Sequence, residues 1–559
     1  MIRREQRRGE GLRVMIKAAD AAPGGGPTLG WWAAAAALVV VLLVPLLMVD
    51  VPPVLDYPNH LARYFVLAHP DDPFLSQVYA PHWRILPNLG MDVIGAALLK
   101  VSSVHVGGRI LLALSLLMPV IGAIVYHRVV FGRFSYWSLA SGVVAYNAVF
   151  FLGFMNFLLS LGLALIGAAA WIALRRRNRN TAAVVIGATF AALTFFSHIF
   201  GVALFALLIG SEEMARIMRT RRDRAPVFGE MAVSALMLAL ALAPAVALYL
   251  ASPLSEAGAG VGPWRGLAKL WDLFAPVMTT SEVVTMLSVA ALLITLGLAI
   301  RGARLAPALP LTLVVLAAGF VIVPAMYKGG SFLDIRLAGM AAVLLFAGML
   351  PQLSPRRAAA VAALVIALIA GRSAYVAQDW YDHRHDLAEL RAAIAHVEPG
   401  ERVLMARGRE VDIIAAAQAG RALARYFPLD NHVGALLTIE RRAFWPLMFA
   451  DATQQPLVVK PAFASYAAPL CEPVELALLM ETASLQVGQA GHRCKTYLAD
   501  WPHRFDAVLM LEPPVTAPSP ELSPVYRGNY VALYRVTPPK AEPGSAGRVH
   551  AGQVSSPVQ

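Results

Sequence analysis

Residues 55–63 read LDYPNHLAR and follow almost directly on a run of apolar residues at 31–49. Asp56 offers a carboxylate that can take up a proton, and His60 and Arg63 stand close to it in the sequence. If a helix begins at Pro58, Asp56 lies near its N-terminal end, where the helix dipole favours a carboxylate. The alternative is that Asp56 serves only as a helix N-cap. Which substrates these side chains can meet depends on the elements that position them.

The composition indicates a membrane protein that crosses the bilayer many times. Of 559 residues, 58% are hydrophobic and 15% charged, whereas soluble proteins carry about 25% charged residues. The run at 31–49 is long enough to cross about 30 Å of hydrocarbon. It is followed by Pro52-Pro53-Val54 without a small-residue cleavage site, which argues against a cleaved signal. The net charge of +12 does not require nucleic acid as a partner, because Lys and Arg collect in the cytoplasmic loops of membrane proteins.

The charge pattern predicts the topology of these apolar runs. We expect eleven spanning helices, at about 30–49, 109–126, 135–152, 155–174, 181–197, 200–214, 230–251, 282–300, 309–327, 336–350 and 358–375. The basic segment 1–29 is placed in the cytoplasm. Alternation then brings the arginine clusters near 128–133, 175–179, 216–224, 301–304 and 356–357 to the same side.

One short apolar segment tests this topology. Residues 86–101 contain Pro87 and Asp92. If this segment crossed the bilayer, every later arginine cluster would face outward, so we interpret it as a helix at the membrane surface. Residues 50–108 then form one long outer loop that opens with LDYPNHLAR, within a transmembrane domain at 30–375.

The same alternation puts everything after residue 375 outside. A small α/β domain at 376–537 is predicted from a helical pattern at 386–397 and strand patterns at 402–405, 507–511 and 530–536. It contains the only two cysteines, Cys471 and Cys494, which could pair in an oxidising periplasm or remain two free buried thiols. Residues 538–559 are expected to be a disordered tail.

Other outer loops add positively charged candidates. His198 stands between two helices, where a lone histidine is more often an interfacial hydrogen-bonding group than a catalyst. Residues 328–336 bring Lys328, Asp334 and Arg336 to the same side. Lys and Arg side chains of this kind attract phosphate, and an ion pair between Asp334 and Arg336 is the alternative. No CxxC or HExxH pattern, phosphate-cradling glycine loop or GxSxG motif occurs, so no metal site is expected.

This layout resembles the GT-C superfamily of polytopic glycosyltransferases, which use sugars linked to polyprenyl phosphate and include protein O-mannosyltransferases and lipid A aminoarabinose transferases. The family's catalytic carboxylate at the start of the first outer loop maps onto Asp56 in LDYPNHLAR. Ser197-His198 matches a turn of the family between the fifth and sixth helices. Tyr57 replaces the second acid of the motif, and the lysine before Pro87 is missing, so metal dependence is not supported.

The resemblance implies transfer of a sugar from a lipid phosphate to an acceptor hydroxyl on the outer face, in the inner membrane of a bacterium, with the α/β domain in the periplasm. Asp56 would be the general base, and the acceptor a glycan, lipid or protein. The donor is a co-substrate, and no other cofactor is expected. The substrate-binding candidates are Tyr57, Asn59, His60, Arg63, His82, Arg84, His198, Lys328, Asp334 and Arg336.

Two other classes of function remain open. A transporter or flippase for a lipid-linked glycan would be expected to carry charged residues well inside its helices and an internal repeat. The sequence shows neither clearly. A non-catalytic scaffold with a periplasmic binding domain is the other alternative.

Overall fold

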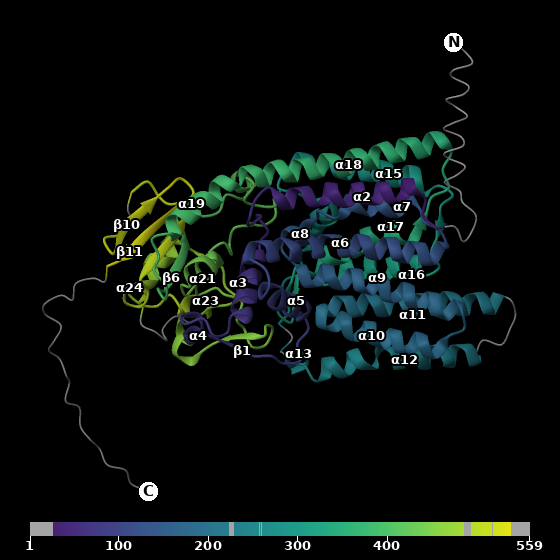
Figure 1. The fold of residues 1–559 in the computed structure, drawn as a ribbon, viewed down its shortest axis with the longest axis horizontal. Coiled ribbons are helices and arrows are strands. Elements are labelled where there is room, and N and C mark those ends of the chain that lie inside the picture. The colour runs from purple at the N-terminus through teal and green to yellow at the C-terminus, as the bar shows by residue number, and fades with distance from the viewer. Residues whose placement is uncertain are drawn as a thin grey trace, which may run out of the picture.

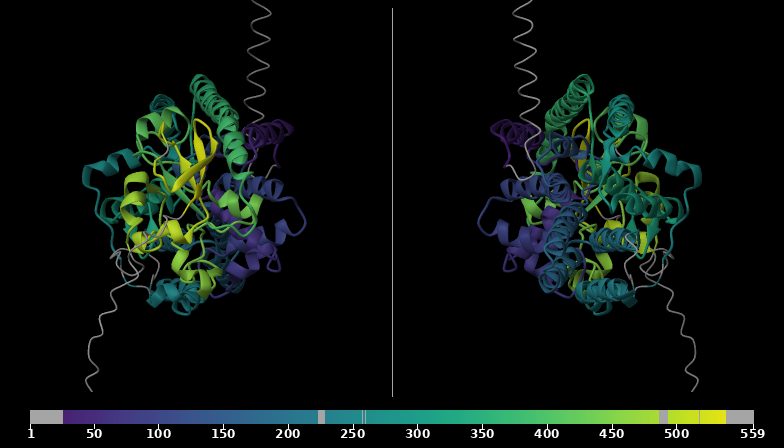
Figure 2. Two further views of the ribbon diagram at one scale, coloured as in Figure 1. Left: turned by 90° about the vertical axis from the view of Figure 1, so that its left-hand side faces the viewer. Right: turned by 90° about the vertical axis from the view of Figure 1, so that its right-hand side faces the viewer.

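A bundle of long helices carries a smaller α/β unit at one end (Figure 1). The computed structural model describes residues 26–222, 228–256, 258, 260–485, 493–516 and 518–537. Most of the basic segment 1–29 and the expected tail 538–559 therefore lie outside the described residues. Viewed along the bundle, the helices lie side by side, and the strands cover one end (Figure 2).

Among the described residues, seven helical segments are long and apolar enough to span a membrane. They are α2 with η1 (Leu29–Leu47), α6 (Val104–Phe131), α9 (Met155–Arg176), α10 (Asn180–Ser197), α12 (Phe228–Leu250), α15 (Glu282–Ile300) and α18 (Pro355–Asp382). Helices α11 (Ile199–Arg222), α16 (Leu309–Ile322) and α17 (Leu333–Gly348) pack into the same bundle. The chain is a multi-pass membrane protein, and these helices coincide with ten of the eleven predicted spans, seven of them long and apolar enough to cross a membrane.

The span expected at 135–152 is not one continuous helix, although its ends contact Trp31 and Asp56 at opposite ends of α2 with η1 and the loop that follows it. The chain there forms the short elements α7 (Tyr136–Leu139), η2 (Ala140–Val144) and α8 (Ala148–Phe151). The side chain of Asn147 accepts a hydrogen bond from the amide of Phe150 and donates to the carbonyls of Val144 and Ala145. These local bonds compete with a continuous helical ladder, so the segment turns instead of crossing in one helix.

The bundle also buries charged side chains within its helices, contrary to expectation. Arg175 of α9 pairs with Glu213 of α11 at 2.7 Å, and Trp171 and Ser234 also bond to Glu213. Arg372 of α18 is buried. It donates to the carbonyls of Val277 and Tyr146 and to Ser288. Because each of these charges is paired or bonded to several acceptors, they tie helices together.

The long outer loop folds into α3 (Tyr57–Ala68), α4 (Leu75–Val78), β1 (Tyr79–Pro81) and α5 (Gly90–Leu99). Helix α5 corresponds to the expected surface helix. Ten residues of helix extend about 15 Å, too short to span a bilayer. A Cβ on Gly95 would lie 2.7 Å from the ring of Tyr64, so glycine lets α5 lie close against α3.

The α/β unit, which we call the α/β domain (residues 384–537), contains strands where the sequence predicts them. Its five-stranded sheet has the order β10-β11-β9-β6-β8, with β6 parallel to both β9 and β8 and β11 antiparallel to its neighbours. The strands are β6 (Val403–Arg407), β8 (Val474–Glu475), β9 (Ala507–Leu511), β10 (Leu522–Arg527) and β11 (Val531–Val536). Its helices are α19 (Arg384–Ile394), α20 (Ile413–Gln418), α21 (Ala435–Arg441), α22 (Leu476–Thr482), α23 (Arg493–Thr496) and α24 (Trp501–Arg504). Cys471 and Cys494 form a disulfide in this domain.

The remaining elements are short connections. They are α13 (Pro253–Glu256), η3 (Gly266–Ala268), α14 (Lys269–Asp272), η4 (Ala275–Val277), η5 (Pro461–Tyr466), β2 (Arg304–Leu305), β3 (Met326–Tyr327), β4 (Gly330–Ser331), β5 (Met349–Leu350) and β7 (Leu457–Val459). Strands β2 and β5 pair with each other, as do β3 and β4.

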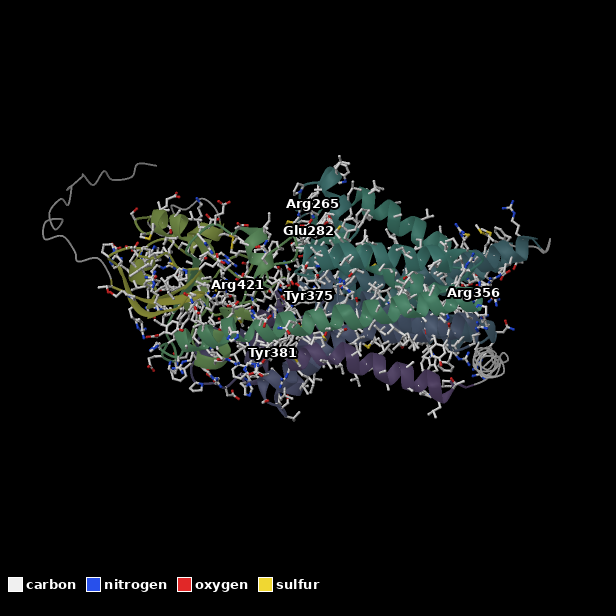
Figure 3. The ribbon with its side chains drawn as sticks, turned by 90° about the horizontal axis from the view of Figure 1, so that it is seen from above. Arg265, Glu282, Arg356, Tyr375, Tyr381 and Arg421 are labelled. Carbon is white, nitrogen blue, oxygen red and sulfur yellow. A yellow bond between two sulfur atoms is a disulfide. The ribbon has the colours of Figure 1, made fainter. Side chains whose placement is uncertain are left out.

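The first outer loop and the α/β domain form one continuous structure. Strand β1 pairs antiparallel with β7, and α3 packs against α21. Arg356 lies at the opposite end of the bundle from Arg421 of the α/β domain (Figure 3). One end of the bundle carries the α/β domain and the other carries Arg356. Asp56 lies at the end that carries the α/β domain.

Candidate active site

The backbone of Asp56 is held by neighbouring segments, and its side chain does not cap a helix. The amides of Leu55 and Asp56 donate to the carbonyls of Phe151 and Leu152, at 2.9 and 3.3 Å. Gly153, with φ +80°, comes so close that an added Cβ would lie 2.9 Å from the Asp56 nitrogen. Asp56 occupies the N-cap position of α3, but its side chain makes no capping hydrogen bond. Its carboxylate is therefore available for another task.

The partner of this carboxylate comes from the α/β domain. The Nδ1 atom of His432 lies 3.1 Å from Oδ1 of Asp56. The imidazole packs edge-on against Phe449 and Trp445, with ring centroids 4.9 and 6.3 Å away. The Asp56 side chain is 16% exposed, so a carboxylate with one fixed neighbour remains accessible. No motif in the sequence singles out His432.

Arg336 and His198, which the sequence places in separate outer loops, are in direct contact. Nη1 of Arg336 lies 2.6 Å from Nε2 of His198, and Nη2 donates to the carbonyl of Ser331 at 3.0 Å. The guanidinium lies over the ring of Phe154, 4.1 Å from its centroid. Nε of Arg336 is buried and has no hydrogen-bond partner among the described residues. A fixed cation with an unused donor is thereby available to an anion.

The Asp56 and Arg336 groups belong to one site. Phe154, which supports the Arg336 guanidinium, directly follows Gly153, which touches Asp56. The site therefore combines a carboxylate and a cation where α3, the start of α9 and the start of α17 meet.

Arg63 is committed to a buried ion pair. Its Nε and Nη2 contact Oδ1 and Oδ2 of Asp92 in α5, at 2.5 and 3.2 Å. Nη2 also lies 3.0 Å from Nδ1 of His60, whose ring stacks on Tyr64. This arrangement fixes α5 on α3 and places His60 beside the site, while most of the Arg63 donors are already used.

Replacing Asp92 with Ala is expected to destabilise the protein by about 3–5 kcal/mol, because removal of one partner leaves a buried charge unpaired. The measurement is the thermal unfolding midpoint of the purified protein in detergent. Arg63→Met combined with Asp92→Leu is the matched control, and it should restore most of the lost stability because it removes both charges. An unfolding midpoint for Asp92→Ala equal to that of the wild type would contradict this role.

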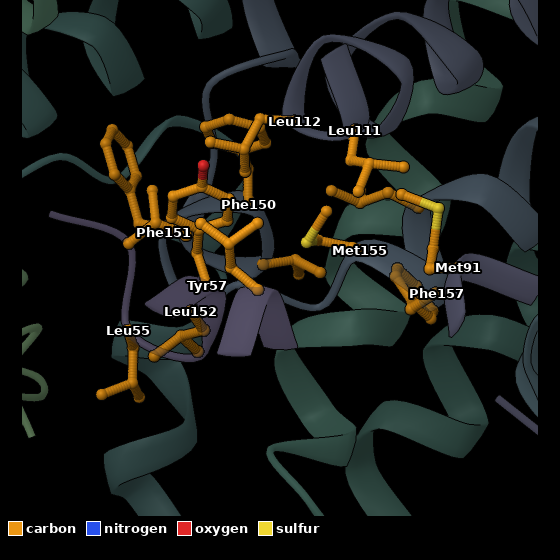
Figure 4. Packing of buried hydrophobic residues seen from close by; sticks show 14 of the residues in the cluster. Leu55, Tyr57, Met91, Leu111, Leu112, Phe150, Phe151, Leu152, Met155 and Phe157 are labelled. Carbon is orange, nitrogen blue, oxygen red and sulfur yellow. The ribbon is translucent and has the colours of Figure 1, made fainter. Parts of the chain in front are cut away.

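Tyr57 and Asn59 are turned to structural contacts. Tyr57 is fully buried, and it packs among apolar side chains that include Leu111 and Leu112 of α6 (Figure 4). Asn59 donates to the carbonyl of Leu447 at 2.9 Å and accepts from the amide of Phe449 at 2.7 Å. Asn59 thus fixes the loop of the α/β domain that packs against His432.

Three further candidates lie apart from this group. His82 and Arg84 are exposed on the loop before α5. Lys328 donates to the hydroxyl of Tyr249 and to the carbonyl of Leu254, at 3.3 and 3.2 Å. In the ranges that the structure covers, no contact joins these three to Asp56 or Arg336. Their roles in substrate binding stay predictions.

Asp334 is buried, and it neighbours Asp272 instead of pairing with Arg336. Nη1 of Arg265 contacts both carboxylate oxygens of Asp272, at 3.1 and 3.0 Å. Burial and the neighbouring Asp334 together raise the pKa of Asp272 to about 7. Two carboxyl groups beside one arginine favour a state in which one of them is protonated.

This carboxyl pair predicts that stability depends on pH. A carboxyl pKa that is higher in the folded state than in the unfolded state gives stability at low pH that is lost as the pH rises through about 7. Asp334→Asn should flatten the fall of the unfolding midpoint between about pH 4 and pH 7, because Asp272 then keeps Arg265 without a second acid. Thermal unfolding of both proteins across this range is the measurement, and equal slopes would contradict the prediction.

Within the described ranges, no group of three or more His, Cys, Asp or Glu side chains gathers in a way that could hold an ion.

Comparison with solved structures finds three that are similar to this chain, two of them of one protein. ArnT from Cupriavidus metallidurans is similar to this chain. The structure bound to undecaprenyl phosphate has 11% identity and a TM-score of 0.46, covering 91% of this chain and 98% of that chain. The apo structure has 12% identity and a TM-score of 0.45, covering 90% and 97%. The arabinofuranosyltransferase AftD from Mycobacteria has 16% identity and a TM-score of 0.40, covering 92% of this chain and 40% of that chain.

Neither a protein-family model nor a curated protein sequence matches the chain. Identities of 11% to 16% do not define a substrate for this chain.

Proposed function

We propose that this protein is a membrane glycosyltransferase that moves a sugar from a polyprenyl-phosphate donor to an acceptor hydroxyl at the outer face. The observation that carries this proposal is that two unlike groups lie against the adjacent residues Gly153 and Phe154. Asp56 presents a carboxylate without a capping bond, and Arg336 presents a buried guanidinium whose Nε has no partner among the described residues.

Asp56 acts as the general base in this proposal. The acceptor hydroxyl approaches the exposed carboxylate, gives its proton to Asp56 and forms a bond to the anomeric carbon of the sugar. The bond between that carbon and the phosphate oxygen breaks. A nearby carboxylate also stabilises the positive charge that develops on the sugar ring, as in glycoside chemistry.

Arg336 stabilises the leaving phosphate. Its guanidinium is fixed before reaction by His198 and the Ser331 carbonyl. A donor that is already in place gains more from the developing negative charge than one that must reorganise. The polyprenyl chain lies among apolar helices, so the donor reaches the site from the bilayer while the acceptor reaches it from water.

The proposed orientation follows from the two ends of the bundle. Arg356 marks the end opposite the α/β domain (Figure 3), and basic clusters favour the cytoplasmic side. The Cys471–Cys494 disulfide lies in the α/β domain, and disulfides persist in oxidising compartments such as the periplasm. We therefore place the protein in a bacterial inner membrane with the active site facing the periplasm.

Charged residues lie within the helices, as would be expected of a transporter. However, Arg175 is paired with Glu213, and Arg372 is bonded to two carbonyls and a hydroxyl. These bonds favour fixed contacts between helices, whereas coupling groups must change partners during transport.

The direct test uses the full-length chain in lipid nanodiscs. Undecaprenyl phosphate is the binding probe, because the ArnT structure contains it, and undecaprenol is the matched ligand without phosphate. A panel of polyprenyl-phosphate-linked pentoses and hexoses is then supplied, and release of polyprenyl phosphate is followed by mass spectrometry. We expect binding that requires the phosphate and release from at least one donor. A protein that neither binds the phosphate lipid nor cleaves any donor would contradict the proposal.

A further inference from the structure

The loop before α21 brings polar residues of the α/β domain to the site described above. Asp430, Asn431 and His432 stand between Leu429 and Val433, and all three polar side chains are buried. His432 is the member of this group that reaches Asp56, with Nδ1 3.1 Å from Oδ1. Buried polar side chains are costly unless they have partners, so the contacts of this loop indicate what it is built to hold.

The loop is fixed from two sides of the α/β domain. Arg407 at the end of β6 forms an ion pair with Asp430 and donates to Oδ1 of Asn431 at 2.6 Å. The hydroxyl of Tyr530, just before β11, donates to Oδ2 of Asp430 at 3.3 Å. His432 is therefore carried by a loop with little freedom to move.

Glu472 supports the same loop from another segment. Nδ2 of Asn431 donates to Oε2 of Glu472 at 3.1 Å, and Glu472 follows Cys471, which is linked to Cys494. Burial raises the pKa of the Glu472 carboxyl, His432 and Arg407 oppose this shift, and Asp56 adds to it. Glu472, His432 and Asp56 are thus within electrostatic range of one another.

The other charged neighbours are accounted for. Arg336 lies over Phe154, which directly follows the Gly153 that touches Asp56. The ring of His60 lies 5.3 Å from that of Phe449, which also packs on His432. Arg63 is neutralised by Asp92. The contact between His432 and Asp56 therefore joins the α/β domain to the proposed base itself, and not to a neighbouring surface group.

We propose that His432 is a positioning residue for Asp56, so that the α/β domain completes the active site. This inference rests on the proposed function. The imidazole of His432, whose Nδ1 lies 3.1 Å from Oδ1 of Asp56 in an ion-pair contact, sets the position of that oxygen and leaves the second carboxylate oxygen for the acceptor hydroxyl. Glu472 and Asn431 keep the loop that carries the imidazole in place.

A purely structural role makes the opposite prediction for two substitutions. His432→Phe keeps a ring between Phe449 and Trp445 but removes the N–H. His432→Asn loses the ring but keeps an amide N–H close to the Nδ1 position. If the residue only fills space, Phe should be the milder change. If it orients Asp56, Asn should be the milder change.

The experiment measures kcat for polyprenyl phosphate release, the dissociation constant for undecaprenyl phosphate and the unfolding midpoint, with each variant as the full-length chain in nanodiscs. We expect His432→Phe to lower kcat about 10–100-fold, because a small displacement of a catalytic group is costly. His432→Asn should stay within about threefold of the wild type on the same scale. Lipid affinity should not change. His503→Phe is the matched control, because His503 is exposed in the same domain.

The outcomes separate the two proposals. If Asp56→Asn is as active as the wild type, the proposed function fails. If Asp56→Asn is inactive while His432→Phe keeps full turnover, or is less damaging than His432→Asn, the positioning role is overturned and the proposed function stands. Glu472→Gln provides a second test should the His432 variants fold poorly. It should lower kcat several-fold without changing lipid affinity, and unchanged kcat in this variant would also overturn the inference.

Discussion

Asp56→Asn is expected to lower turnover about 10²–10⁴-fold, the range that general bases contribute, while undecaprenyl phosphate binds with unchanged affinity. Asparagine keeps the shape of the side chain but cannot accept the proton of the acceptor hydroxyl at neutral pH. The substitution should also be well tolerated by the fold, because the Asp56 side chain makes no capping hydrogen bond. Release of polyprenyl phosphate and lipid binding are measured on the same nanodisc preparation.

Asp71→Asn is the control for this substitution, because Asp71 is an exposed acid in the same outer loop. It should behave as the wild type in both measurements. Wild-type turnover by Asp56→Asn would show that the carboxylate is not the base. A parallel loss of lipid affinity would instead assign Asp56 to ground-state binding of the donor, again contrary to the proposal.

The sequence predicts those parts of the site that depend on helix order. His198 and Arg336 are 138 residues apart, yet both were assigned to outer helix ends, and the structure brings them to 2.6 Å. The alternation of spans made this possible, even though the segment at 135–152 is broken into α7, η2 and α8. Apolar strands such as β9 (Ala507–Leu511) were also predictable, because a short continuous run of apolar residues is typical of a buried strand.

The sequence does not reveal contacts between separate units. Arg63 and Asp92 both stood out as charged residues in an apolar setting, but no periodicity says that they pair with each other. His432 was missed because it lies in an irregular stretch with no motif. One signal was present: three polar residues, Asp430, Asn431 and His432, stand between apolar neighbours. Such a cluster has to be satisfied by partners when it is buried, but the identity of those partners is a tertiary property.

The position of the α/β domain also changes how its role is understood. An accessory binding module would be expected to meet the membrane part through surface contacts only. Here, β7 extends a sheet with β1 of the first outer loop, Asn59 is bonded to the loop at 447–449, and His432 reaches Asp56. The base therefore has neighbours from both parts of the chain, so changes in either part should alter catalysis.

Arg336→Gln is expected to weaken binding of undecaprenyl phosphate about 10–100-fold, because a hydrogen bond to a charged group contributes about 1.5–3 kcal/mol. The loss in kcat/KM for donor cleavage should be larger, about 10²–10³-fold, since the phosphate gains negative charge as the bond to the sugar breaks. Isothermal binding and initial-rate measurements on one preparation give both values.

Arg336→Lys tests whether charge alone is sufficient. Lysine keeps the positive charge but lacks the planar fork of the guanidinium. In the native protein, that fork contacts His198 and the Ser331 carbonyl while Nε remains without a partner among the described residues. We therefore expect Arg336→Lys to recover part of the lipid affinity but little of the loss in kcat/KM. Arg409→Gln, at an exposed arginine of the α/β domain, is the control and should match the wild type. If Arg336→Gln bound the lipid and cleaved donors normally, another group would have to stabilise the leaving phosphate. That result would contradict the role proposed for Arg336.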